Sequence, residues 1–213
     1  MRYGRMPDTV PDQGSHGHDT PLERRRAFRR MVESRSAALL PGAANALSAR
    51  IIEDVGFKAV YVTGAGVTNT QLGLPDLGLV TATEIAETTA RISDVCRLPV
   101  LVDMDTGFGN ALNAYGTVQK LERAGAAAIQ IEDQVFPKKC GHFAGKAVIP
   151  IEEMLGKLKA CLDARTDENT LIVARTDARA IEGFEAALDR AHRMAEVGAD
   201  VLFIEAPESV EEI

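Results

Sequence analysis

Short apolar segments alternate with segments of helical periodicity along most of this chain. The apolar segments are Ala38–Pro41, Ala59–Thr63, Val100–Asp105, Ala128–Glu132, Leu171–Arg175 and Val201–Glu205. Polar residues do not alternate with apolar ones within them, which is typical of strands buried on both faces of a parallel sheet. This order of strands and helices predicts an α/β fold with a parallel sheet.

Helical periodicity fills the segments before and between these strands. The predicted helices are Pro21–Ser36, Ala46–Val55, Thr83–Cys96, Ala111–Ala124, Ile151–Ala164 and Gly183–Val197. Three junctions to a following strand carry a glycine, at Gly56, Gly125 and Gly198, and glycine readily adopts the left-handed conformation that ends a helix. The arginines of the first helix are interpreted as a solvated or interface face without a catalytic role.

Two parallel architectures compete for this pattern. A doubly wound sheet places its ligand where the strand order reverses, whereas every strand end of a (β/α)8 TIM-type barrel faces one central site. Polar or ionisable residues close nearly every predicted strand: Asn45, Thr63, Asp103, Asp105, Glu132, Arg175 and Glu205. This distribution favours the barrel. Six strands cannot close with eightfold geometry, so we expect residues 21–213 to form a barrel domain truncated after its sixth strand.

Composition excludes several classes of protein. The net charge of −7 and the lack of a basic stripe argue against nucleic acid as a partner, and no apolar run approaches the ~20 residues of a membrane helix. Three widely spaced cysteines predict no disulfide framework and a reducing, cytoplasmic location. Residues 1–20 are rich in Gly, Pro, Asp and His, which predicts a disordered N-terminal arm.

Acidic residues gather at the ends of two neighbouring predicted strands. Asp103 and Asp105 are separated by one residue, so on a strand their side chains share a face. Glu132 closes the next strand, and Asp76 lies in a preceding loop. Unpaired carboxylates inside a barrel are costly without a cation, and Mg²⁺ or Mn²⁺ prefers such oxygen ligands. The alternative is a set of helix caps or salt-bridged acids.

A cysteine follows two lysines and precedes Gly141 and His142 in the segment KKCGH. Cationic neighbours favour the thiolate form of Cys140, and a loop after a strand is where sites collect. The alternative is an inert buried thiol. Cys96 and Cys161 lie in helical segments and are interpreted as structural.

Two further features point to an acidic ligand. Arg175 ends a buried strand and offers a planar guanidinium to a carboxylate, although an ion pair with Asp177 is an equal alternative. Glu205 could orient a substrate or balance Arg175. The Gly-rich segment Thr63–Asn69 resembles a dinucleotide turn only superficially, and we interpret it as a loop whose N–H groups approach a substrate carboxylate.

The motifs TGAG, LGLPDLG, VDMDTGFGN, IEDQVFPKKCGH, ARTDA and FIEAPES together resemble the isocitrate lyase / phosphoenolpyruvate mutase superfamily. The resemblance runs from about Leu39 to Glu212, and the cysteine of KKCGH is similar to that of the lyase branch, which includes 2-methylisocitrate and 2,3-dimethylmalate lyases. It implies a (β/α)8 barrel that binds Mg²⁺ and a small carboxylic acid, commonly as a homotetramer with a swapped C-terminal helix.

The resemblance also implies roles for individual residues. Metal ligands would be Asp103 and Asp105, supported by Asp76 and Glu132. Substrate would be bound by Thr63, Gly64, Ala65, Cys140, Gly141, His142, Arg175 and Glu205. Cys140, Arg175 and Glu205 would be catalytic, with Cys140 as acid/base.

The implied reaction cleaves a carbon–carbon bond of a 2-hydroxy di- or tricarboxylic acid. The products would be a 2-oxo acid such as pyruvate and a carboxylate. Departures at Ala65 and Ile204 from the usual 2-methylisocitrate lyase motifs are closer to dimethylmalate lyases and oxaloacetate-cleaving relatives. An oxaloacetate hydrolase or decarboxylase, and an inactive truncated fragment, are the alternatives.

Overall fold

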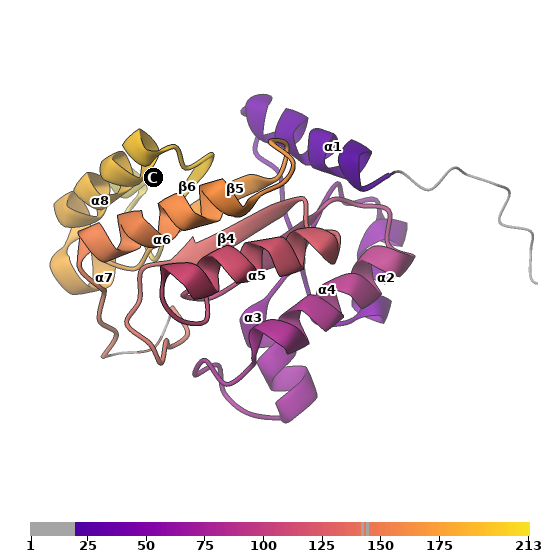
Figure 1. Ribbon diagram of the computed structural model, residues 1–213, viewed down its shortest axis with the longest axis horizontal. Coiled ribbons are helices and arrows are strands. Elements are labelled where there is room, and N and C mark those ends of the chain that lie inside the picture. The colour runs from indigo at the N-terminus through magenta and orange to yellow at the C-terminus, as the bar shows by residue number, and fades with distance from the viewer. Residues whose placement is uncertain (1–19, 142, 144) are drawn as a thin grey trace, which may run out of the picture.

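The computed structural model describes residues 20–141, 143 and 145–213. Its sheet contains six strands in the order β1-β2-β3-β4-β5-β6, and every neighbouring pair is parallel (Figure 1). The strands are β1 (Gly42–Ala43), β2 (Val60–Val62), β3 (Val100–Asp103), β4 (Ala128–Glu132), β5 (Leu171–Thr176) and β6 (Val201–Ile204). Because spatial order equals sequence order, the chain has the topology of a barrel rather than of a doubly wound sheet.

The helices follow the predicted alternation closely. They are α1 (Pro21–Glu33), α2 (Ala46–Val55), α3 (Gly64–Val67) continuing into the π-helical turn η1 (Thr68–Leu72), α4 (Ala82–Val95), α5 (Ala111–Arg123), α6 (Ile151–Ala164), α7 (Arg179–Glu182), α8 (Phe184–Val197) and the 3₁₀ turn η2 (Val210–Glu212). Gly56, Gly125 and Gly198 have φ angles of 97°, 102° and 113°, which confirms the predicted left-handed junctions.

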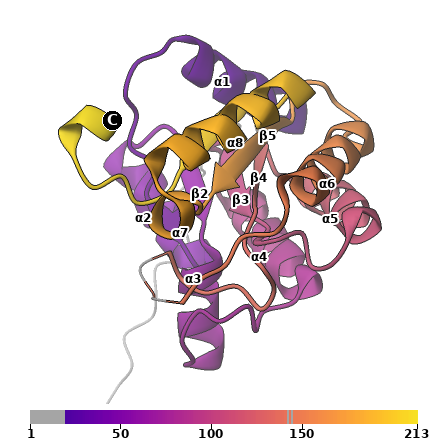
Figure 2. The same ribbon diagram turned by 90° about the vertical axis from the view of Figure 1, so that its left-hand side faces the viewer.

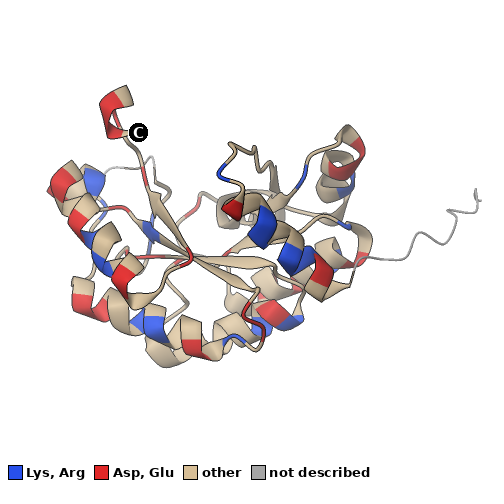
Figure 3. Ribbon diagram, turned by 90° about the horizontal axis from the view of Figure 1, so that it is seen from above, with Lys and Arg blue, Asp and Glu red and all other residues tan. Residues whose placement is uncertain are grey.

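Strands β3 and β4, and nearly all of β5, are buried on both faces, whereas β6 at the edge is partly exposed. On the outer face, Val102, Ile129 and Ile131 belong to one core with Leu121 of α5 and Leu158 of α6. Seen from the α1 end, the helices form an arc around the sheet and leave one side open (Figure 3). Basic and acidic segments are mixed along this arc. A smaller cluster covers the inner face and contains Phe28, Ala59, Leu101, Ala128 and Leu171.

Helix α1 covers one end of the sheet, opposite the end where α3 lies (Figures 1 and 2). Phe28 is 2% exposed and reaches the inner cluster. Arg24 Nη1 donates to the carbonyl of Cys96 at the end of α4, and Arg25 Nη2 donates to the carbonyl of Glu122 in the last turn of α5. These cations therefore hold helix C-termini, where they oppose the helix dipole, and the prediction of a merely solvated face is wrong for them.

The first strand differs in position from its prediction. Ala38–Pro41 was expected to be a strand, but the sheet residues are Gly42 and Ala43. Leu40 instead packs against the inner cluster, while Leu39 is 79% exposed. The apolar run therefore reflects packing beside the sheet rather than membership of it.

Among the described residues, β1 pairs with β2 alone and β6 with β5 alone, so the sheet does not close. The same residues contain no helix that is long and apolar enough to cross a membrane. Residues 1–19 lie outside the described part of the chain, and the disordered arm stays a prediction.

Candidate active site

A cavity of about 730 Å³ runs along the inner face of the sheet, from Phe28 and Met31 of α1 to the carboxyl ends of the strands. Alternate residues of each strand point into it, because side chains on a strand change face at every step. At the carboxyl ends of the strands, the cavity is lined by Thr63 after β2, Asp103 of β3, Glu132 of β4, Arg175 of β5 and Glu205 after β6. The structure thus brings together most of the polar strand ends that the sequence singled out, whereas Asn45 caps α2 and its Oδ1 accepts from the Ser48 N–H.

Asp103 and Asp105 form a buried pair, each 6% exposed. The Asp105 N–H donates to Asp103 Oδ1 at 3.0 Å, and Asp105 has a φ of 49°, a left-handed conformation that is uncommon outside glycine. Burial, together with the charge of Asp103, raises the pKa of Asp105 to about 7 although Lys138 opposes the shift. A Cβ added to Gly64 would lie 3.1 Å from Asp105 Oδ1, so the backbone of Gly64 lies against this pair.

A lysine bridges two of the predicted metal residues. Lys138 Nζ lies 2.7 Å from the Asp76 carboxylate and 2.8 Å from Asp105 Oδ1. Burial would lower the pKa of Lys138, but the charges of Asp105 and other nearby carboxylates outweigh it and raise that pKa. Asp76 and Asp105 are therefore salt-bridged acids, as the alternative expected. Lys138 forms both of these ion pairs.

Arg175 is surrounded by acids. Its Nε lies 2.9 Å from Asp177 and 3.3 Å from Glu132, and its Nη2 lies 3.5 Å from Glu205. The guanidinium also lies 5.4 Å from the centre of the Phe203 ring. Arg175 therefore forms the ion pair with Asp177 that was the alternative, and it also lines the cavity, while its binding of a substrate carboxylate stays a prediction.

Glu132 has one oxygen without a partner. Its Oε1 is buried and accepts no hydrogen bond, and burial raises its pKa well above the ordinary value although Arg175 opposes the shift. Such an orphaned oxygen beside two aspartates is suited to a hydrated divalent cation. Mg²⁺ usually keeps several waters and binds through one or two carboxylates, so this donor set fits Mg²⁺. Within the described residues, no group of three or more His, Cys, Asp or Glu side chains is arranged to hold a metal ion, so water would have to supply most of the ligands.

The Gly-rich segment after β2 is helical rather than a loop. Thr63 begins α3, and its Oγ1 accepts a hydrogen bond from the Gly66 N–H at 3.2 Å. Thr63 and Ala65 line the cavity, so the segment still presents a hydroxyl and backbone to a ligand.

The loop that carries the thiol reaches the same cavity. Cys140 is half-buried and its N–H donates to the Asp76 carbonyl at 3.2 Å. A Cβ added to Gly141 would collide with Glu205 Oε1 and would lie 2.9 Å from Arg175 Nη2, so a side chain at this position would displace Glu205 and Arg175. His142, a predicted substrate contact, lies outside the described residues.

Tyr61 and Lys146 escaped the sequence analysis. Tyr61 lines the cavity and its hydroxyl accepts a hydrogen bond from Gln130 Nε2 at 3.1 Å. Its position two residues before Thr63 on the same strand face could have revealed it. Lys146 and Asp177 pair at 2.7 Å across 31 positions of sequence, and no spacing rule connects them.

Fold and site define a class: parallel α/β barrel-type proteins whose strand ends collect carboxylates, an arginine and a loop thiol around one cavity. Within that class, the family described as phosphoenolpyruvate phosphomutase matches residues 28–213. The chain belongs to this family and to the wider isocitrate lyase / phosphoenolpyruvate mutase superfamily.

Curated relatives include two lyases. The chain is 53% identical over 193 residues to a 2-methylisocitrate lyase of Aeropyrum pernix, covering 90% of this chain and 62% of that protein. It is 46% identical to a 2,3-dimethylmalate lyase of Eubacterium barkeri, covering 87% and 64%. The chain therefore spans a little over three fifths of the length of these relatives.

Solved structures show the same arrangement. An oxaloacetate acetylhydrolase in complex with 3,3-difluorooxalacetate superposes with a TM-score of 0.87 at 34% identity, covering 91% of this chain and 67% of that one. A phosphonopyruvate hydrolase in complex with oxalate and Mg²⁺ has a TM-score of 0.79 at 30% identity, covering 87% and 64%.

Proposed function

We propose that this chain carries the active site of a Mg²⁺-dependent carbon–carbon lyase. Its substrate is a 2-hydroxy di- or tricarboxylic acid of the 2-methylisocitrate or 2,3-dimethylmalate type, and its products are a 2-oxo acid such as pyruvate and a carboxylate. The observation that carries the proposal is the contact of Gly141, next to the Cys140 thiol, with Arg175 and Glu205 in the cavity that Asp103 and Glu132 also line.

The substrate carboxylates meet complementary groups in this proposal. Arg175 binds one carboxylate with its planar guanidinium, and the Thr63 hydroxyl with the backbone of Gly64 and Ala65 binds another. Glu205 orients the substrate and balances Arg175. By the resemblance to the superfamily, we assign to His142 the support of a substrate carboxylate.

The metal is assigned to the aspartate pair. Asp103 and Asp105 would hold Mg²⁺ or Mn²⁺, supported by Asp76 and Glu132. An ion held there would supply stabilisation of negative charge on the 2-oxygen of the substrate. The complex of phosphonopyruvate hydrolase with oxalate and Mg²⁺ supports this assignment.

The reaction is a retro-aldol cleavage. A base removes the proton of the 2-hydroxyl, the C2–C3 bond breaks, and the carbonyl of the 2-oxo acid forms. The electron pair of the broken bond passes to the second fragment as an enolate-like carboxylate. The Cys140 thiol then protonates that carbon.

Product analysis tests the proposal. Incubation with 2-methylisocitrate or 2,3-dimethylmalate and Mg²⁺ should release pyruvate or another 2-oxo acid, measured by coupled reduction. EDTA should abolish the release and added Mg²⁺ should restore it. Turnover that ignores the chelator would contradict the metal assignment, and a lack of any 2-oxo acid would contradict the lyase.

The second candidate is hydrolysis or decarboxylation of oxaloacetate. It is favoured by the structural similarity to oxaloacetate acetylhydrolase, whose TM-score is 0.87. Release of oxalate and acetate from oxaloacetate, with no cleavage of the 2-hydroxy acids, would decide for it. An inactive fragment is the third alternative, and a cooperative melt together with turnover would exclude it.

We further propose that the protein acts in the cytoplasm as a homo-oligomer, with a tetramer as the expected state, and that it binds neither nucleic acid nor membranes. Support comes from the charge and cysteine pattern and from the superfamily resemblance. Light scattering of the eluted protein would measure the mass of the assembly.

A further inference from the structure

One buried carboxylate lies between the cavity and the thiol loop. Asp177 has a fully buried side chain, and its Oδ2 accepts from Arg175 Nε at 2.9 Å while its Oδ1 accepts from Arg175 Nη2 at 3.1 Å. Oδ1 also accepts from Lys146 Nζ at 2.7 Å. The Asp177 N–H is itself fixed by Asp133 Oδ1 at 3.0 Å.

Lys146 connects this carboxylate to the loop. Its side chain is 3% exposed, and its Nζ donates to the Gly141 carbonyl at 2.7 Å. Gly141 is the residue whose backbone lies against Arg175 and Glu205. The contacts form a ring: Gly141 to Lys146, Lys146 to Asp177, Asp177 to Arg175, and Arg175 back to Gly141.

We propose that Lys146 is a positioning residue that ties the loop bearing Cys140 to the substrate arginine through Asp177. The inference deepens the proposed function, because the ring would set the place of the thiol relative to the group that binds the carboxylate. Lys146 touches neither substrate nor metal in this assignment. It acts through Gly141.

Burial makes this tie specific. A buried ammonium is stable when it is paired and hydrogen-bonded, and Lys146 has both a carboxylate and a carbonyl as acceptors. Although burial opposes ionisation of Asp177, hydrogen bonds and charges from Arg175 and Lys146 outweigh it and lower the pKa of this carboxyl. The carboxylate therefore stays charged and can hold both cations at once.

Removal of the ammonium should loosen the loop without unfolding the sheet. In Lys146→Met the apolar stem remains, but the Gly141 carbonyl and Asp177 lose a charged donor. We expect the amides of Cys140 and Phe143, which donate to Asp76 and to Cys140, to exchange with deuterium about tenfold faster, which is the factor for one lost hydrogen bond to a charged group. Amides of β4 and β5 should exchange at the original rate.

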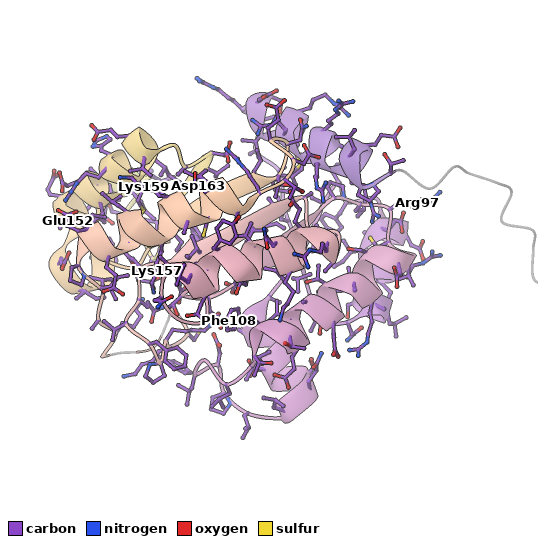
Figure 4. The ribbon with its side chains drawn as sticks, in the orientation of Figure 1. Arg97, Phe108, Glu152, Lys157, Lys159 and Asp163 are labelled. Carbon is purple, nitrogen blue, oxygen red and sulfur yellow. The ribbon has the colours of Figure 1, made fainter. Side chains whose placement is uncertain are left out.

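Alkylation of Cys140 gives a second readout that needs no turnover. Iodoacetamide should label Cys140 selectively, because Cys96 and Cys161 are buried. The labelling rate should rise about tenfold in Lys146→Met by the same argument. Lys159→Met is the matched control, since Lys159 is an exposed lysine on α6 (Figure 4), and it should leave both rates unchanged.

A double-mutant cycle separates a ring from two independent contacts. Asp177→Asn should speed labelling as Lys146→Met does, and the double variant should be no faster than Asp177→Asn. Where the chain turns over substrate, kcat should fall about tenfold in Lys146→Met with a smaller change in KM. If Lys146→Met does not fold, Lys146→Gln replaces it in the same measurements.

Unchanged exchange and labelling in Lys146→Met, or additive effects in the cycle, would overturn the proposal. A loss of turnover in Lys146→Met with unchanged exchange and labelling rates would also overturn it, because Lys146 would then act on the chemistry directly. Absence of turnover in the unaltered protein would defeat the proposed function alone, since exchange and labelling still decide the role of Lys146.

Discussion

The two ends of the sheet use buried carboxylates in opposite ways. At the end covered by α1, Glu122 accepts hydrogen bonds from Thr166 N and Oγ1, Asp167 N and Thr170 Oγ1 at 2.7–3.1 Å. Burial alone would raise its pKa, but these hydrogen bonds outweigh burial and lower it. The ionised carboxylate here is fully satisfied and ties α5 to the segment before β5.

At the opposite end, Asp105 and Glu132 are crowded by like charges and burial raises the pKa of each. Glu132 lines the cavity and keeps one oxygen without a hydrogen bond, while Asp105 pairs with a cation, Lys138 Nζ, at 2.8 Å. The same residue type thus stabilises the fold at one end and is held in an unfavourable state at the other. In barrel proteins that division separates stability from function, and the following experiments test whether it holds here.

The largest expected effect is on activity at the cavity end. Cys140→Ser should lower kcat by about 10²–10⁴-fold, the usual contribution of a positioned general acid. The free energy of unfolding should change by less than about 1 kcal/mol, because the half-buried thiol fills no core position. Pyruvate release and urea unfolding measure the two quantities, and near-normal turnover would remove Cys140 from the mechanism.

Asp105→Asn probes the aspartate pair with little change in shape. Asparagine tolerates the left-handed conformation of this position, but it lacks the charge that the proposed Mg²⁺ site needs. We expect at least a 10²-fold loss of turnover, and a change in unfolding free energy below about 1 kcal/mol since a repelled charge is removed. A strong loss of stability instead would mean that Asp105 serves the fold.

Glu122→Ala should show the reverse behaviour. Four hydrogen bonds to a charged group disappear and their donors remain buried, so the protein should lose about 3 kcal/mol of unfolding free energy. Turnover per folded molecule should stay within about twofold, because Glu122 lies at the opposite end of the sheet from the carboxyl ends of the strands, which carry the proposed catalytic residues. An activity loss without a stability loss would break the division between the two ends.

The pH dependence of stability should have opposite signs at the two ends. Glu122 has an ordinary pKa of 4.5 that folding lowers, so its contribution is full above about pH 4.5 and is lost as the pH falls through the folded pKa. Asp105 has an ordinary pKa of 3.8 that folding raises to about 7, so its ionisation destabilises the metal-free protein as the pH rises from about 4 to 7.

Urea unfolding in EDTA across this pH range measures both effects. The advantage of the unaltered protein over Glu122→Gln should shrink below pH 4.5. The stability of the unaltered protein relative to that of Asp105→Asn should decline as the pH rises toward 7. Parallel curves for the two comparisons would contradict the assignment of pKa shifts.

Local signals predicted the regular part of the fold. Helix α2 was predicted at its observed bounds because Asn45 caps its start and Gly56 ends it. The sequence predicted a loop where the Gly-rich turn α3 lies, because small residues carry no hydrophobic periodicity. The apolar run before β1 misled in a similar way, since packing beneath the sheet produces the same composition as a strand.

The sequence predicted those site residues that lie at strand ends or in motifs of the superfamily. Asp103, Glu132 and Arg175 share one cavity because parallel strands end at one edge. The partner of each charge could not be predicted, since Lys138 pairs with Asp76 across 62 positions and Lys146 pairs with Asp177 across 31. Such pairs depend on how loops fold back over the sheet, which no local pattern records.

The sequential strand order has a consequence for synthesis of the chain on the ribosome. Each strand from β2 to β6 pairs with the strand translated just before it, so each new strand meets a hydrogen-bonding partner that has already been synthesised. The growing polypeptide can therefore add one βα unit at a time to a template that already exists, which keeps contact formation local and fast.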